Sequence, residues 1–157
     1  MARLAPTLGL ASETLGRGSR IVADAEQSVH YQWRGDASDA ELFALTEAHG
    51  GRPESGWWDK SRPHCLGWVT ARLPAGDLIG FVNVAWDGAD HAFILNTKVA
   101  SAHQRRGIAT ELVAVAVRSA RAAGCEWLHV DFAEELSPFY FGACGFRPTT
   151  AGLIYLY

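Results

Sequence analysis

VASAHQRRGIA, residues Val99–Ala109, is the stretch that decides the fold, because a strand-like run ends in it and a helix begins. Before it, Ala92–Val99 is apolar and typical of a strand. After it, apolar side chains recur at helical spacing as far as Gly124, and Glu126–Phe132 favours another strand. A strand, a helix and a strand in this order form a crossover that makes the two strands parallel. We therefore expect a ligand beyond their carboxyl ends, at Ala100–Ala109.

The same turn has the chemistry of an anion-binding site. The first N–H groups of a helix lack partners within the helix and carry the positive end of its dipole. Gly107 and Ala109 keep the surface low enough for a phosphate to contact the backbone. A lone glycine beside arginines is usually plain surface, but the strand before this one and the amphipathic helix after it favour phosphate binding.

The remaining pattern predicts one domain of class α/β (α+β). Five further runs are strand-like, namely Ser28–Arg34, Cys65–Leu73, Leu78–Trp86, Gly145–Arg147 and Leu153–Tyr157. Helices are expected at Asp39–His49 and Ser137–Cys144, and a loop at Arg52–His64. The sheet is therefore mixed and mostly antiparallel, with a parallel pair at its centre and helices flanking it. Residues 1–27 form an N-terminal arm of unknown role before the domain at residues 28–157.

Composition disfavours several classes of protein. A net charge of -3 and scattered arginines give no basic surface for nucleic acid. No eighteen apolar residues follow one another, so we expect no membrane span. Cys65, Cys125 and Cys144 lie far apart, without a CxxC pair or a histidine at metal-ligand spacing. We therefore expect no metal site, no disulfide and a cytoplasmic location.

Two segments carry a resemblance to a known family. Gln104–Ala109, QRRGIA, resembles the Q/R-x-x-G-x-G/A signature of the GCN5-related N-acetyltransferase (GNAT) family. Pro138–Phe146, PFYFGACGF, is similar to the last helix of that family where it runs into a glycine-phenylalanine strand start. The order of elements fits over Ser28–Tyr157. The resemblance implies that the two parallel strands splay apart around an acyl-coenzyme A, whose pyrophosphate lies on the amides of Arg105–Ala109.

The resemblance also implies an activity, the transfer of an acyl group, most commonly acetyl, from acyl-coenzyme A to a primary amine of a small molecule or peptide. A backbone N–H within Thr97–Val99 would polarise the thioester carbonyl. The alternative is a non-catalytic module that senses acyl-coenzyme A. The residues expected to contact the cofactor are Thr97, Lys98, Val99, Gln104, Arg105, Arg106, Gly107, Ile108, Ala109, Thr110, Phe139 and Tyr140.

Three side chains are candidates for acid–base catalysis. The family's acid is a tyrosine four residues before the last glycine, a register that falls on Phe141 here, so Tyr140 takes this role only if the helix carries an extra residue. Otherwise Tyr140 is a packing aromatic. The strand Ala92–Val99 offers no acidic residue as a base. Alternation places His129 and Asp131 on one face of the next strand, either as bases or as a core histidine and a loop cap.

Two apolar features predict further contacts. Trp57 and Trp58 lie in the segment that, by the resemblance, covers the acceptor side of the cleft. They either contact a flat or cationic substrate or form a lid packed on the core. The run Leu153–Tyr157 is too apolar for a free sheet edge, so we expect it to pair with a second copy in a homodimer.

Overall fold

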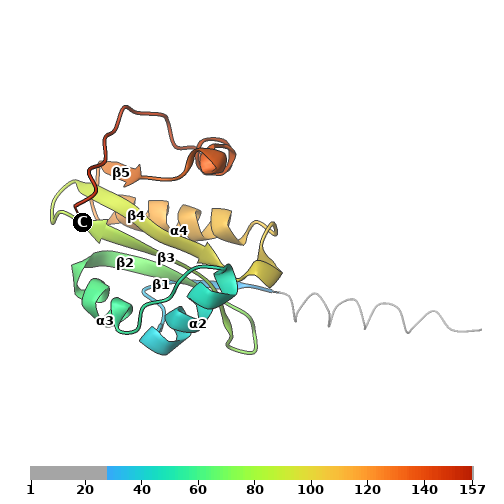
Figure 1. The fold of residues 1–157 in the computed structure, drawn as a ribbon. Helices are drawn as coiled ribbons and strands as arrows, with labels where there is room; N and C mark the ends of the chain where they lie inside the picture. Colours follow the sequence, from blue (N-terminus) through green and yellow to red (C-terminus); the bar gives the residue numbers. More distant parts are fainter. Residues whose placement is uncertain (1–27, 157) are drawn as a thin grey trace, which may run out of the picture.

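In the computed structural model, which describes residues 28–156, the strands follow the order β1-β2-β3-β4-β5 (Figure 1). They are β1 (His30–Trp33), β2 (Cys65–Arg72), β3 (Leu78–Trp86), β4 (His91–Val99) and β5 (Trp127–Val130). All neighbours are antiparallel except β4 and β5, which are parallel. The mixed, mostly antiparallel sheet is therefore confirmed, with β5 as its edge among the described residues.

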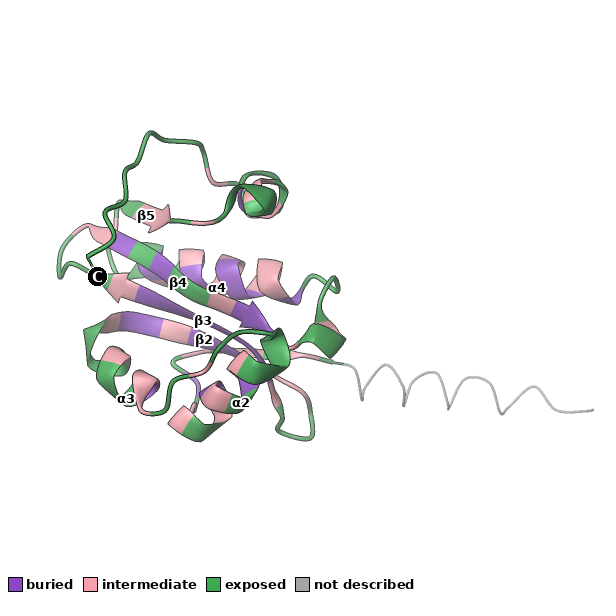
Figure 2. Ribbon diagram, viewed as in Figure 1, coloured by how far each residue is buried: buried purple, intermediate pink, exposed green. Residues whose placement is uncertain are grey.

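Helices cover both faces of this sheet. They are α2 (Asp39–His49), α3 (Trp57–Ser61), α4 (Ile108–Ala122) and a π-helix (Pro138–Ala143), with 3-10 turns at Arg62–His64, Ser101–His103 and Glu134–Leu136. One core cluster packs α4 against the middle strands, and a second packs α2 and α3 against Phe81 on the other face. Figure 2 shows the buried residues concentrated in β2, β3, β4 and α4.

Local signals define the two long helices. A capping box starts α2, since the Ser38 side chain accepts from the Glu41 N–H while the Glu41 carboxylate accepts from the Ser38 N–H. Left-handed Gly50 ends it. In α4 the buried residues Ile108, Leu112, Ala116 and Ala120 recur every fourth position, which is one face of a helix.

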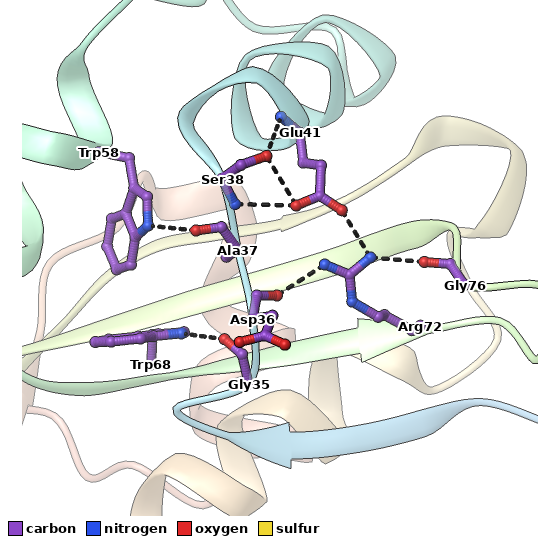
Figure 3. A network of polar contacts seen from close by, with 9 residues as sticks. All are labelled: Gly35, Asp36, Ala37, Ser38, Glu41, Trp58, Trp68, Arg72 and Gly76. Atoms are coloured by element: carbon purple, nitrogen blue, oxygen red, sulfur yellow. Dashed lines mark hydrogen bonds and ion pairs between the residues drawn. The ribbon is translucent and has the colours of Figure 1, made fainter.

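Arg72 on β2 ties the start of α2 to the sheet (Figure 3). Its guanidinium forms an ion pair with the Glu41 carboxylate at 2.8 Å. It also donates hydrogen bonds to the carbonyl oxygens of Asp36, at 2.7 Å, and Gly76, at 2.6 Å. A planar guanidinium donates in several directions at once, so one side chain links the helix, the segment before it and the β2–β3 turn.

Two indole N–H groups hold the same segment from the other side (Figure 3). Trp58 donates to the Ala37 carbonyl at 3.0 Å, and Trp68 donates to the Gly35 carbonyl at 2.7 Å. These hydrogen bonds hold residues 35–38 against α3 and β2. The orientation of α2, whose C-terminal end reaches the carboxyl end of β4, follows from these contacts.

The loop expected at Arg52–His64 is instead partly helical, because it contains α3 and a 3-10 turn. The periodicity of so short a helix cannot be detected, and its start is held by a distant side chain. The Asp39 carboxylate accepts from the N–H of Gly56 at 2.7 Å and from that of Trp58 at 3.0 Å.

The two last strands, expected at Gly145–Arg147 and Leu153–Tyr157, are absent from the described residues up to 156. After the π-helix the chain runs back past β5 without pairing with it (Figure 1). Residues 153–156 are 80–90% exposed. A strand exists only where a neighbour takes its backbone hydrogen bonds, so β-forming residues alone do not make one. Tyr157 and the arm at residues 1–27 lie outside the described residues.

The Arg72–Glu41 ion pair makes the free energy of unfolding depend on pH in the acidic range. The hydrogen bond from Arg72 is the main reason that the pKa of Glu41 is lowered from 4.5 to about 2. The stabilisation is therefore complete above pH 4.5 and is lost as the pH falls from 4.5 to 2. We expect Glu41→Gln, which keeps the cap, to lower the free energy of unfolding at neutral pH by about 0.5–1 kcal/mol, because the pair is partly exposed.

Urea denaturation measured at several pH values checks this expectation. The free energy of unfolding of Glu41→Gln should depend less on pH than that of the wild type between pH 4.5 and 2. Glu47→Gln, which removes an exposed carboxylate from the same helix, is the control. Equal behaviour of the two variants would contradict a specific role for the pair.

Candidate active site

A cavity of about 380 Å³ opens where β4 and β5 part. The two strands pair only at His91–Ile94 and Trp127–Val130, so within residues 28–156 the rest of β4 has no strand on that side. The cavity reaches from this free edge to the start of α4 and to the π-helix. Its lining residues are His49, Thr97, Lys98, Val99, His103, Gln104, Arg105, Gly107, Ile108, Ala109, Thr110, Leu136, Phe139 and Tyr140.

One end of the cavity is formed by the turn into α4. Arg105 and Gly107 both have left-handed backbone conformations, with φ of 58° and 80°. Gly107 is the N-cap residue and has no side chain to cap the helix. The first helical hydrogen bond runs from the Glu111 N–H to the Gly107 carbonyl, at 3.1 Å, so the amides of residues 108–110 have no partner within the helix. A Cβ atom built on Gly107 would meet nothing within 4 Å, which shows that the space above the turn is open.

The structure brings together all the residues expected to contact the cofactor except Arg106. Arg105 lines the cavity, whereas the Arg106 guanidinium lies 3.3 Å from Nδ1 of His103. Three lining residues were not expected, namely His49, His103 and Leu136. His103 adjoins the expected turn, but His49 comes from the end of α2, and no local pattern in the sequence indicates it.

Two side chains cover the edge of β4 at Val99. The Nδ1 atom of His49 lies 3.2 Å from the Val99 nitrogen and 2.8 Å from its carbonyl oxygen, and the Gln104 side chain donates to that oxygen at 3.0 Å. One Nδ1 atom cannot donate and accept at once. Both backbone groups of Val99 are satisfied when His49 accepts from the Val99 N–H and Gln104 donates to the Val99 carbonyl. A ligand that displaces His49 would gain a backbone donor.

Tyr140, and not Phe141, faces the cavity. The last helix is a π-helix, in which the Cys144 N–H bonds to the Phe139 carbonyl at 2.9 Å, so each turn holds one residue more than an α-helix. Tyr140 is 6% exposed and lines the cavity, whereas Phe141 is 37% exposed and does not. Burial raises the pKa of Tyr140, an effect that Thr97 beside it partly offsets. The phenol therefore keeps its proton at neutral pH.

The two candidate bases do not line this cavity. His129 stacks on Phe93, with ring centroids 4.6 Å apart, and its Nε2 atom lies 2.8 Å from Nδ1 of His91. Phe93 precedes Thr97 by four residues, which along a strand is about 13 Å. Asp131 is exposed beyond the end of β5. His129 thus lies in a stack of rings on the sheet, and Asp131 lies at the surface.

A second, smaller cavity of about 180 Å³ lies between α2, residues 52–57 and β4. Trp57 and Lys98 line it, and Lys98 also lines the first cavity. Trp58 is fully buried and packs edge-on against Trp68 and Phe81. Of the two tryptophans expected at the acceptor side, Trp57 alone therefore has surface for a ligand.

None of the three cysteines is an activated nucleophile. Burial raises the pKa of Cys65 and Cys125, and it raises that of Cys144 to about 11, so all three are thiols at neutral pH. No group of three potential metal ligands occurs among residues 28–156. In the same part of the chain, no helix has the length and apolar character needed to span a membrane.

The parallel edge of the sheet thus opens onto the uncapped start of a helix through the QRRGIA turn. The model of the acetyltransferase (GNAT) family matches residues 24–146, and the chain belongs to this family. No curated protein sequence matches the chain closely enough to count as a relative.

Solved structures of similar fold are acetyltransferases by name. A probable acetyltransferase of methicillin-resistant Staphylococcus aureus is 20% identical, with a TM-score of 0.69 over 83% of this chain and 100% of that one. A putative acetyltransferase from Deinococcus radiodurans R1 is 21% identical, with a TM-score of 0.69 over 83% and 90% of the two chains. The enzyme AAC(6')-Iy, solved with the bisubstrate analogue CoA-S-monomethyl-acetylneamine, is 19% identical, with a TM-score of 0.65 over 82% and 97%.

Proposed function

We propose that the protein transfers an acyl group, preferably acetyl, from acyl-coenzyme A to a primary amine of a small molecule or peptide. One observation carries this proposal: the same cavity is lined by the uncapped amides of a helix start and by a buried tyrosine. Similar folds also support it, since AAC(6')-Iy was solved with coenzyme A and with an acetylneamine analogue. The structure is consistent with a cytoplasmic enzyme whose cysteines are all free thiols.

The described residues fit a coenzyme A. Amides 108–110 and the Arg105 side chain supply donors and positive charge where a pyrophosphate would lie. The open space above Gly107 lets phosphate oxygens reach the backbone. The free edge at Val99 offers one N–H and one carbonyl to an amide-containing arm. Coenzyme A would supply the activated thioester, and the protein has only to place it against an amine.

The protein's own groups then have defined tasks. The Val99 N–H, released by His49, polarises the acyl carbonyl and stabilises the oxyanion formed when the amine attacks. The Tyr140 phenol, protonated at neutral pH, donates to the departing sulfur. Among the described residues no carboxylate lines the larger cavity, and we assign the loss of the ammonium proton to water. Attack is direct, because none of the three cysteines is an activated thiolate that would form an acyl-enzyme.

Two features favoured the alternative, a non-catalytic sensor: the absence of a glutamate on β4, and the register that places Phe141 where the family has its tyrosine. The π-helix turns Tyr140 into the cavity, so only the missing glutamate still supports the sensor. An amine panel separates the two functions. An enzyme releases coenzyme A thiol from acetyl-coenzyme A in an amine-dependent reaction. A sensor binds acetyl-coenzyme A without this release.

Coenzyme A affinity should depend on Gly107. We expect Gly107→Ala to weaken coenzyme A binding roughly tenfold or more, measured by calorimetry, because a methyl group enters the phosphate seat and strains a left-handed residue. Gly88→Ala is the matched control, since Gly88 has a φ of 87°, equally open surroundings and a position at the other end of β4. Both variants should lose similar stability. Unchanged affinity in Gly107→Ala would contradict the proposed phosphate seat.

Turnover should depend on the Tyr140 hydroxyl. We expect Tyr140→Phe to lower kcat about a hundredfold, with little change in coenzyme A affinity, because the ring remains packed on Phe132 while the donor is lost. Wild-type turnover should hold up to high pH, since the pKa of Tyr140 is raised above 10.0. Tyr31→Phe, a half-buried tyrosine on β1, is the control. Equal kcat in wild type and Tyr140→Phe across pH would remove Tyr140 from the mechanism.

We also propose that the protein forms a homodimer through its C-terminal run. Leu153, Ile154 and Leu156 are 80–90% exposed, and β5 has a strand on one side only. Such an apolar run gains free energy by pairing with a second copy. Sedimentation at micromolar concentration should show a dimer, and Ile154→Lys should shift it to the monomer. A monomeric wild type would overturn this proposal.

A further inference from the structure

Lys98 is a buried cation without a counter-ion. Its residue is 8% exposed, and its Nζ atom donates to Thr46 Oγ1 at 2.8 Å and lies 5.1 Å from the ring centroid of Trp57. Among residues 28–156 no carboxylate lies within ion-pairing distance of it. Burial accordingly lowers the pKa of Lys98. An ammonium kept from water is costly unless a negative charge reaches it.

The charges around the 180 Å³ cavity are unevenly paired. Asp39 and Glu54 both line it, but Asp39 accepts from two backbone N–H groups and Glu54 is ion-paired with Lys60 at 3.3 Å. Arg52 also lines the cavity, and no ion pair engages it within the described residues. Neither carboxylate forms an ion pair with Lys98 or Arg52, so among the described residues these two cations have no anionic partner. A ligand that complements this cavity brings a negative charge.

This cavity also adjoins the reaction site. Lys98 lines both cavities, and its neighbours on β4, Thr97 and Val99, line the larger one. A small ligand anchored at the Lys98 ammonium is therefore held within a few atoms of the strand edge that faces the thioester. The apolar part of the smaller cavity, formed by Leu42, Phe43 and the Trp57 ring, accommodates a hydrocarbon portion.

We propose that the acceptor is an amine that also carries an anionic group, carboxylate or phosphate, and that this group binds Lys98 Nζ in the cavity shared with Arg52 and Trp57. This inference rests on the proposed acyl transfer and names its acceptor class. It disfavours a second positive charge at this position, because the buried Lys98 ammonium repels it. Lys98 here determines specificity and is not a base.

Matched acceptors that differ only in the anion test this proposal. For the carboxylate, L-leucine is compared with isoamylamine, and L-phenylalanine is compared with phenethylamine. For the phosphate, O-phosphoethanolamine is compared with ethanolamine. Kanamycin represents a polycationic acceptor. We expect kcat/KM to be roughly tenfold to a hundredfold higher for the anionic member of at least one pair, the range of a charge-assisted hydrogen bond. Equal or higher values for every member that lacks the anion, or for kanamycin, would overturn the proposal.

Variants of Lys98 separate anchoring from other roles. Lys98→Met should abolish the preference for the anionic member of each pair, mainly by raising its KM relative to that of the member without the anion. Lys98→Arg should restore part of the preference, because arginine keeps the charge but cannot act as a base. Arg121→Met, which removes an exposed cation from the end of α4, is the control. Equal loss of kcat for all amines, without rescue by arginine, would show a base and contradict anchoring.

Direct binding separates this inference from the proposed function. Calorimetry of L-leucine, L-phenylalanine and O-phosphoethanolamine, with coenzyme A at saturation, requires no turnover. Lys98-dependent binding without any amine-dependent thiol release would refute the acyl transfer while leaving the anion site in place. Thiol release with no anionic preference and no Lys98-dependent binding would refute the anion site while leaving the acyl transfer.

Discussion

After Ile94, β4 continues to Val99 without β5 beside it, and the site depends on this parting of the two strands. Backbone N–H and C=O groups on a free strand edge need partners, and leaving them unpaired in a closed interior is costly. The protein keeps a cavity there and covers Val99 with the side chains of His49 and Gln104. Because side chains are easier to displace than a strand, the edge is both satisfied at rest and open to a ligand.

The second requirement is that α4 starts at the same place. Its apolar face, from Ile108 to Ala120, packs on the middle strands, so the core holds the helix axis and its N-terminal end in position. The left-handed turn at Arg105 and Gly107 leaves the first amides uncapped beside the free edge of β4. Core packing thereby places the positive end of the helix next to the edge of β4 that His49 and Gln104 cover.

Helix α2 contributes residues to the walls of both cavities. One turn of this helix separates Thr46, which bonds Lys98, from His49, which covers Val99. The Arg72 and tryptophan contacts fix where α2 begins, and so they also fix these two residues some distance away. A single helix therefore positions residues of both cavities, the one proposed for the thioester and the one proposed for the acceptor.

Local rules determined much of the fold from the sequence alone. Capping residues and a left-handed glycine define α2 to the residue, and the fourfold spacing in α4 and the turn before it are likewise local. Tertiary structure alone decided which arginine lines the cavity, that a π-helix presents Tyr140, and that Trp58 is buried while Trp57 is not. It also brought His49 to Val99 across fifty residues and formed no strand at residues 153–156. Periodicity and caps act between near neighbours, whereas these outcomes depend on which distant surfaces pack together, and a single sequence does not encode that choice in any one segment.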